Sequence, residues 1–102
     1  MNVKVEQRGS FVRMVLDGDI DEKGADMLNK QFRDIKKNSL SELCLDFRKV
    51  NYIGSSGIGQ LILFYKEMAP GRGKVKIENV SKEIYELLLD LDINKVIDIQ
   101  KK

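Results

Sequence analysis

The succession of three patterns between residues 43 and 68 constrains the fold of this chain most strongly. Residues 43–47 form a short, almost continuously apolar run, which is typical of a strand buried on both faces. A segment rich in glycine and serine follows at 52–59, and apolar residues then recur at helical spacing at Ile58, Leu61, Ile62, Tyr65 and Met68. A buried strand that leads through a glycine turn into a helix predicts a crossover connection, and therefore a sheet with parallel strands.

The rest of the chain continues this alternation of strands and helices. Apolar and polar residues alternate around 3–5, 11–17 and 75–77, which predicts strands there, and a final strand is predicted at 96–99. Two further helices are predicted from apolar residues at helical spacing, namely Ala25, Leu28, Phe32 and Ile35, and then Ile84, Leu87, Leu88 and Leu91. The order β-β-α-β-α-β-α-β predicts an α/β fold, with a mixed sheet of four or five strands flanked by helices and an antiparallel hairpin at its start.

The composition is that of one soluble globular domain spanning residues 1–102. Lys and Arg number 18 against 16 Asp and Glu, and this balance argues against nucleic acid or an anionic membrane as the main partner. Lys36 and Lys37 are expected at the solvated C-terminal end of the first helix. The longest apolar stretch, 61–65, is too short to cross a membrane, so we expect a cytoplasmic protein without membrane insertion. Cys44 stands alone, which leaves no disulfide or thiol metal cluster and predicts a small core residue.

Two polar loops are predicted to share one edge of the sheet. Residues 18–21 and the connection 46–57 each follow a strand and lead into a helix, and ligands of open parallel sheets bind beyond the carboxyl ends of the strands. Helix capping is the simplest explanation of Asp19 or Asp21, and support of the serine loop is the alternative. A catalytic carboxylate pair is disfavoured, because the chain has no histidine and no partner motif.

Ser55 and Ser56 lie at a helix start, bracketed by Gly54, Gly57 and Gly59. A helix start carries unpaired N–H groups and the positive end of the dipole, so it suits an anion such as a phosphoryl group. Without histidine the serines lack the usual activating base, which favours a switch over an enzyme. In the simpler alternative, Ser55 caps the helix and the glycines serve turns and close packing. Glycine within a helix costs about 1 kcal/mol relative to alanine, so Gly57 and Gly59 indicate close backbone approach or a site.

The segment 53–59 resembles the phosphorylation motif of STAS domains, the sulphate-transporter and anti-sigma-factor-antagonist family. The usual motif is an apolar residue, Asp-Ser-Ser-Gly or Asp-Ser-Ala-Gly, then Leu or Ile and Gly, and this chain matches at every place but one. Residues 18–21, Gly-Asp-Ile-Asp, resemble the family's Gly-Glu/Asp-Leu/Ile-Asp loop, and 45–47 resemble its central strand. The resemblance covers nearly the whole chain.

The resemblance implies a stand-alone anti-sigma-factor antagonist in a partner-switching circuit. In that family the unphosphorylated domain binds a serine-kinase-type regulator, the kinase phosphorylates the first serine of the motif, and a phosphatase reverses the modification. Carried over to this chain, the phosphorylation site is Ser55, with Ser56 as second choice, and no catalytic residue, cofactor or metal is expected. The implied partner-binding surface consists of Asp19, Asp21, Gly54, Ser55, Ser56 and Gly57.

Gly54 is the one departure, since it replaces the acidic residue that precedes the phosphoacceptor in the family motif. This leaves open a constitutive, non-phosphorylated STAS subunit, for example of a membrane transport complex. An alternative of another class is a small nucleotide-binding enzyme that uses the glycine turn. The glycine spacing fits neither the dinucleotide fingerprint nor the Walker A pattern, which disfavours that alternative.

Overall fold

The computed structural model describes residues 1–35 and 40–102. The strands β1 (Asn2–Arg8) and β2 (Phe11–Asp17) precede the helix α1 (Glu22–Arg33), and β3 (Glu42–Lys49) precedes α2 (Ser55–Met68). A short 3-10 helix η1 (Ala69–Gly71), β4 (Lys74–Val80), α3 (Lys82–Asp90), the 3-10 helix η2 (Ile93–Lys95) and β5 (Asp98–Lys101) follow. The predicted element order is confirmed, whereas Lys36 and Lys37 lie outside the described residues.

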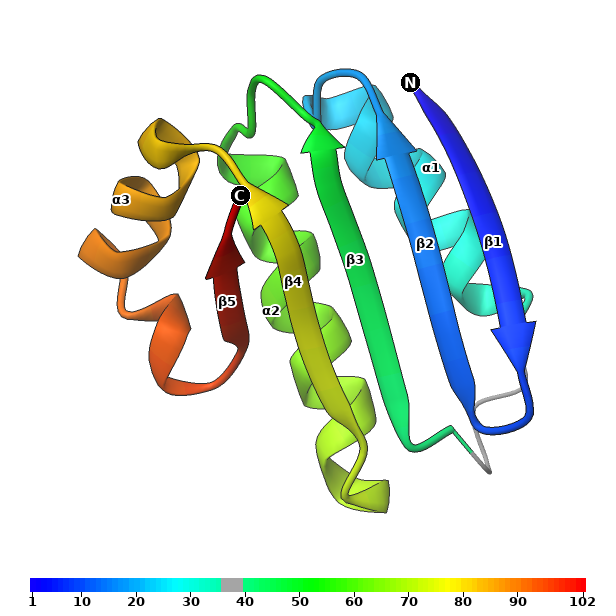
Figure 1. Ribbon diagram of the computed structural model, residues 1–102. Helices are drawn as coiled ribbons and strands as arrows, with labels where there is room; N and C mark the ends of the chain where they lie inside the picture. Colours follow the sequence, from blue (N-terminus) through cyan, green and yellow to red (C-terminus); the bar gives the residue numbers. More distant parts are fainter. Residues whose placement is uncertain (36–39) are drawn as a thin grey trace.

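The strands form one five-stranded mixed sheet in the order β1-β2-β3-β4-β5. β1 and β2 are antiparallel, and the remaining neighbours are parallel. α1 and α2 lie against the same face of the sheet, and α3 lies beside the β5 edge (Figure 1). Among the described elements, no helix covers the opposite face of the central strands, which we call the open face. The helical layer is therefore on one side only.

Most of the core lies between the sheet and the helices α1 and α2. The predicted inward face of β2 is buried, with Met14 and Leu16 fully so. Phe32 of α1 and Phe64 of α2 are also fully buried, and their ring centroids lie 4.6 Å apart. This aromatic pair joins the two helices over the centre of the sheet.

The buried face of α2 differs from the predicted stripe. Leu61 and Met68 are buried as predicted, and Phe64 and Gln60 complete the buried face. Three members of the predicted stripe are only half-buried, namely Ile58, Ile62 and Tyr65. Because residues 61–65 are all apolar, the sequence is compatible with more than one stripe, and packing of Phe64 against α1 selects the one observed.

The predicted buried stripe of the third helix is confirmed at two of its four positions. Ile84 and Leu88 of α3 are buried, but Leu87 and Leu91 are 38% and 49% exposed. Because α3 lies at the edge of the sheet, only a narrow stripe of it is covered. The chain then turns through η2, and β5 begins at Asp98 rather than at residue 96.

Candidate functional site

The two polar loops are joined by backbone hydrogen bonds at the carboxyl edge of β2 and β3. Ile20 and Ile53 form an isolated parallel bridge. The N–H of Ile20 donates to the carbonyl of Tyr52 at 2.8 Å, and the N–H of Gly54 donates to the carbonyl of Ile20 at 3.0 Å. The predicted shared edge is therefore present, and the start of α2 is held directly beside the acidic loop (Figure 1).

In the acidic loop, Asp21 has the capping role. It is the N-cap of α1, and its carboxylate accepts a hydrogen bond from the N–H of Gly24 at 2.8 Å. A Cβ at Gly24 would lie 2.5 Å from the carbonyl oxygen of Asp19, so the helix start is packed tightly against the loop backbone. The side chain of Asp19 is exposed and takes no part in the cap.

At the start of α2, the N-cap is Gly54 and not Ser55. The carbonyl of Gly54 accepts the first helical hydrogen bond, from the N–H of Ile58 at 3.0 Å, and no side chain caps this end. Ser55 is the first helical residue. Ser55 and Ser56 are both exposed, and neither hydroxyl is hydrogen-bonded to a described residue. Both hydroxyls are therefore accessible, and neither supports the fold.

The two glycines within α2 have different surroundings, and only one of them is required by packing. A Cβ at Gly57 would lie 2.6 Å from Cγ1 of Ile53 and 2.7 Å from Cγ2 of Ile20, distances too short for any real contact. A Cβ at Gly59 would meet nothing within 4 Å. Close packing thus explains Gly57, which lets α2 approach the bridge between the loops, and it does not explain Gly59.

Gly54 has an ordinary backbone conformation, with φ −96° and ψ −175°, which any residue adopts. Positive φ is therefore not what favours glycine here. A Cβ at this position would lie 2.9 Å from the hydroxyl oxygen of Tyr52, whose side chain is 53% exposed. An aspartate at position 54 fits the backbone, provided that the exposed ring of Tyr52 moves aside.

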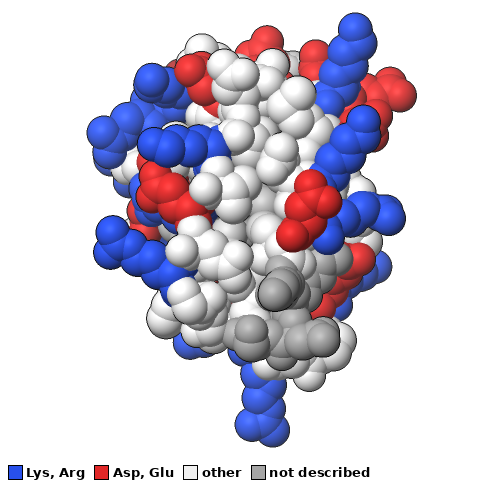
Figure 2. All heavy atoms as spheres, turned by 90° about the vertical axis from the view of Figure 1, so that its right-hand side faces the viewer, with Lys and Arg blue, Asp and Glu red and all other residues white. Residues whose placement is uncertain are grey.

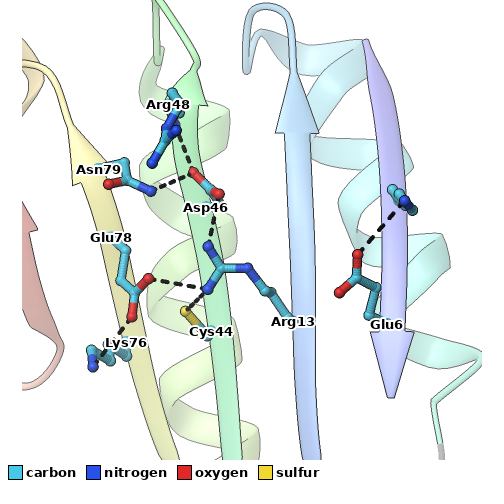
Figure 3. A network of polar contacts seen from close by, with 9 residues as sticks. Glu6, Arg13, Cys44, Asp46, Arg48, Lys76, Glu78 and Asn79 are labelled. Atoms are coloured by element: carbon cyan, nitrogen blue, oxygen red, sulfur yellow. Dashed lines mark hydrogen bonds and ion pairs between the residues drawn. The ribbon is translucent and has the colours of Figure 1, made fainter. Parts of the chain in front are cut away.

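A polar network on the open face supports the strand that leads into the site (Figure 3). Asp46 is buried, with only 8% of the residue exposed. One of its oxygens accepts hydrogen bonds from the N–H of Arg48 at 2.9 Å and from Nδ2 of Asn79 at 3.0 Å, and the other accepts from Arg13 at 2.8 Å. Arg13 also contacts Glu78 at 3.0 Å, so three neighbouring strands are tied together.

The network keeps the Asp46 carboxylate charged. Burial acts to raise its pKa, but the hydrogen bonds from Asn79, the Arg48 backbone and Arg13 outweigh burial and hold the pKa below the usual value. The sequence analysis missed this cluster. The available signal was Asp46, the one acidic residue in an otherwise apolar run. The network also changes the explanation for the burial of β3, because charged side chains, and not helices, cover this strand on the open face.

Cys44 lies beneath the same network and is buried, as predicted. Burial is the main reason that its pKa is raised to about 11, so the thiol is protonated and poorly nucleophilic at neutral pH. Among the described residues, no group of histidine, cysteine or carboxylate side chains is placed to hold a metal ion. None of the described helices is long and apolar enough to cross a membrane.

Comparison with known proteins agrees with this geometry. The family model of the STAS domain matches residues 2–102. The anti-sigma-B factor antagonist of Bacillus subtilis (strain 168) is 26% identical over 102 residues, which is 100% of this chain and 93% of that protein.

Solved structures of similar fold include SpoIIAA in its unphosphorylated form, with TM-score 0.77, 14% identity and coverage of 99% of this chain and 88% of that one. Bacillus SpoIIAA in the phosphorylated form gives TM-score 0.75 at 16% identity, covering 96% of this chain and 90% of that one. An anti-sigma-factor antagonist (STAS) domain protein from Planctomyces limnophilus gives TM-score 0.80 at 17% identity, covering 98% and 89%. The element order, the joined loops and the family match over nearly every residue lead to one conclusion: this chain belongs to the STAS domain family.

Proposed function

We propose that this chain is an anti-sigma-factor antagonist, a cytoplasmic binding module without catalytic activity that works in a partner-switching circuit. Its partner is an anti-sigma factor of the serine-kinase type, and a phosphatase reverses the modification. The support is the full-length similarity to a protein named anti-sigma-B factor antagonist, together with the STAS fold. We assign the contact surface to the edge formed by residues 18–21 and the first turn of α2.

The accessibility of Ser55 is the observation that carries the proposal. Its hydroxyl lies exposed at the first position of α2 and makes no contact on which the fold depends. A phosphoryl group adds about −1.5 to −2 charges, and the positive end of the helix dipole tolerates them in the free domain. At a contact surface the same charges oppose binding through repulsion or desolvation. Phosphorylation of Ser55 thus removes the partner without unfolding the domain.

The same edge has features suited to a protein partner. Tyr52 and Met27 are 53% and 38% exposed, and aromatic residues and methionine are enriched in interfaces. A hollow of ≈ 340 Å³ beside the acidic loop is lined by Asp19, Asp21 and Met27, among others. A partner that contacts the serines therefore also meets apolar side chains and a recess.

Incubation with the cognate kinase-type regulator and ATP, followed by phosphopeptide mapping, tests the proposal. We expect modification at Ser55. Ser55→Ala should bind the regulator normally and stay unmodified, whereas Ser55→Asp should weaken binding at least about tenfold, equivalent to about 1.4 kcal/mol. Ser56→Ala is the matched control and should behave as wild type. Modification at Ser56 alone would reassign the site, and failure to bind any kinase-type regulator would refute the proposed function.

Gly54 favours a second candidate, a constitutive STAS subunit of a larger assembly that is never phosphorylated. A carboxylate is missing at the N-cap position where the STAS motif has one, and such a carboxylate could assist the kinase or the phosphatase. Restoring it by Gly54→Asp separates the candidates, because the backbone conformation accepts aspartate. Faster modification of Ser55 in the variant supports the switch. An unmodified Ser55 in both proteins, with binding intact, supports the constitutive subunit.

A nucleotide-binding enzyme is the remaining alternative of another class. Titration calorimetry with ATP and with GTP in the presence of magnesium addresses it. The binding-module proposal predicts no heat of tight binding to the isolated chain, and a saturable, magnesium-dependent signal would contradict it.

A further inference from the structure

The outer edge of β1 is unpaired in the described part of the chain. β1 is the first strand of the sheet, seven residues long, and it pairs on one side only, with β2. An exposed strand edge presents a row of free N–H and C=O groups, which is a template for pairing with another strand. Such an edge needs either protection or a partner.

The hairpin turn determines which backbone groups of β1 face outward. Gly9 and Ser10 form a two-residue turn, with φ +58° at Gly9, closed by the pair Arg8 and Phe11. The pair that closes a two-residue hairpin exchanges hydrogen bonds, and bonded and non-bonded pairs then alternate along the ladder. The even-numbered residues of β1 therefore direct their N–H and C=O groups toward β2. Val3, Val5 and Gln7 direct theirs away from the sheet.

This outward set is self-complementary in one antiparallel register. With Val5 opposite Val5 of a second copy, Val3 and Gln7 pair across the new ladder, and every outward N–H finds a carbonyl. The same register places Lys4 opposite Glu6 of the other copy twice, at the non-bonded positions where side chains are closest. A register centred on Lys4 would place Lys4 opposite Lys4 of the other copy, and one centred on Glu6 would place Glu6 opposite Glu6, so both registers oppose like charges.

The surface beside this edge is uncharged. Figure 2 shows a band without charged side chains running down the β1 side of the molecule, with Lys, Arg, Asp and Glu on both flanks. Val5 is 36% exposed, while the side chains of Lys4 and Glu6 on the other face of the strand are 75% and 51% exposed. Pairing of two β1 strands would cover part of this band.

We propose that two copies of this chain associate through β1, antiparallel and centred on Val5, so that their sheets join into one. The strands of the two copies then run in opposite directions, and the edges that carry Ser55 point to opposite ends of the dimer. Both edges stay accessible, so the dimer presents two partner sites. A single strand pair buries little surface, so the association is weak and depends on concentration.

Sedimentation equilibrium and amide hydrogen exchange on the intact chain test this. From about 10 μM to about 1 mM protein, the mass should rise from 11.7 kDa toward twice that value. The amides of Val3, Val5 and Gln7 should become protected over the same range, while those of Lys4 and Glu6 should be protected throughout. A constant 11.7 kDa at about 1 mM, or a dimer in which the Val5 amide exchanges freely, would overturn the proposal.

Charge reversal checks the register. Glu6→Lys and Lys4→Glu should each weaken dimerisation about tenfold, because each creates like-charge pairs across the new ladder. The double variant Lys4→Glu/Glu6→Lys restores opposite pairs and should restore the wild-type association. Glu83→Lys on the exposed surface of α3 makes the same change in net charge as Glu6→Lys and should have no effect. Circular dichroism confirms that each variant is folded, and a double variant as weak as the single ones contradicts the register.

Discussion

Alanine at position 57 should destabilise the protein relative to alanine at position 59, although both replace a glycine of the same helix. Each substitution gains about 1 kcal/mol of helix propensity. At Gly59 nothing lies within 4 Å of the new methyl group, so the gain is retained, and the midpoint of thermal unfolding should rise by about 4–8 °C. At Gly57 the methyl group would lie 2.6 Å from Ile53 and 2.7 Å from Ile20. Such overpacking typically costs about 1–3 kcal/mol, which cancels or exceeds the propensity gain.

The two variants should therefore differ by about 1–3 kcal/mol in the free energy of unfolding. Urea denaturation followed by far-ultraviolet circular dichroism measures both values, and Gly59→Ala is the matched control for the helix term. Ile20 and Ile53 are fixed by their mutual bridge and by backbone hydrogen bonds, so they have little freedom to move away. Equal stabilisation by the two alanines would refute the argument that Gly57 exists for close packing.

Three further outcomes are expected. Leu88→Ala should lower the free energy of unfolding by about 2–5 kcal/mol, whereas Leu91→Ala, at a 49% exposed position, should change it by less than about 0.5 kcal/mol in chemical denaturation. The pKa of Asp46 is lower in the folded state than in the unfolded state. Its contribution to the free energy of unfolding is therefore present above the unfolded-state pKa of 3.8 and is lost as pH falls through the folded-state pKa. Asp46→Asn should lower stability at pH 7 by about 1–3 kcal/mol and flatten the acid limb of a stability–pH profile; an unchanged profile would contradict the network. Cys44, with a pKa of about 11, should react with a thiol reagent at pH 8 only as fast as the protein unfolds, and rapid labelling of the native state would contradict its burial.

Features that depend on neighbours along the chain could be predicted without the structure. The order of strands and helices follows from local periodicity. A capping role for Asp19 or Asp21 follows from their place before the helix, and the structure selects Asp21, whose carboxylate accepts a hydrogen bond from the N–H three residues ahead. Placement of the two polar loops on one edge also followed, because parallel strands end on the same side of a sheet. The resemblance of residues 53–59 to a known motif rests on the same local information.

Which side chains are buried, and which residues of different elements touch, became visible only in the folded protein. Periodicity could not choose Phe64 over Ile62 as the buried residue, because that depends on where Phe32 of α1 lies. It could not distinguish Gly57 from Gly59, because the obstacle is the side chain of Ile20 on another loop. The network around Asp46 joins three strands, and the exposure of Leu87 follows from the position of α3 at the edge of the sheet. Burial and contact are properties of the assembled layers, and a local sequence pattern specifies only which faces are able to be buried.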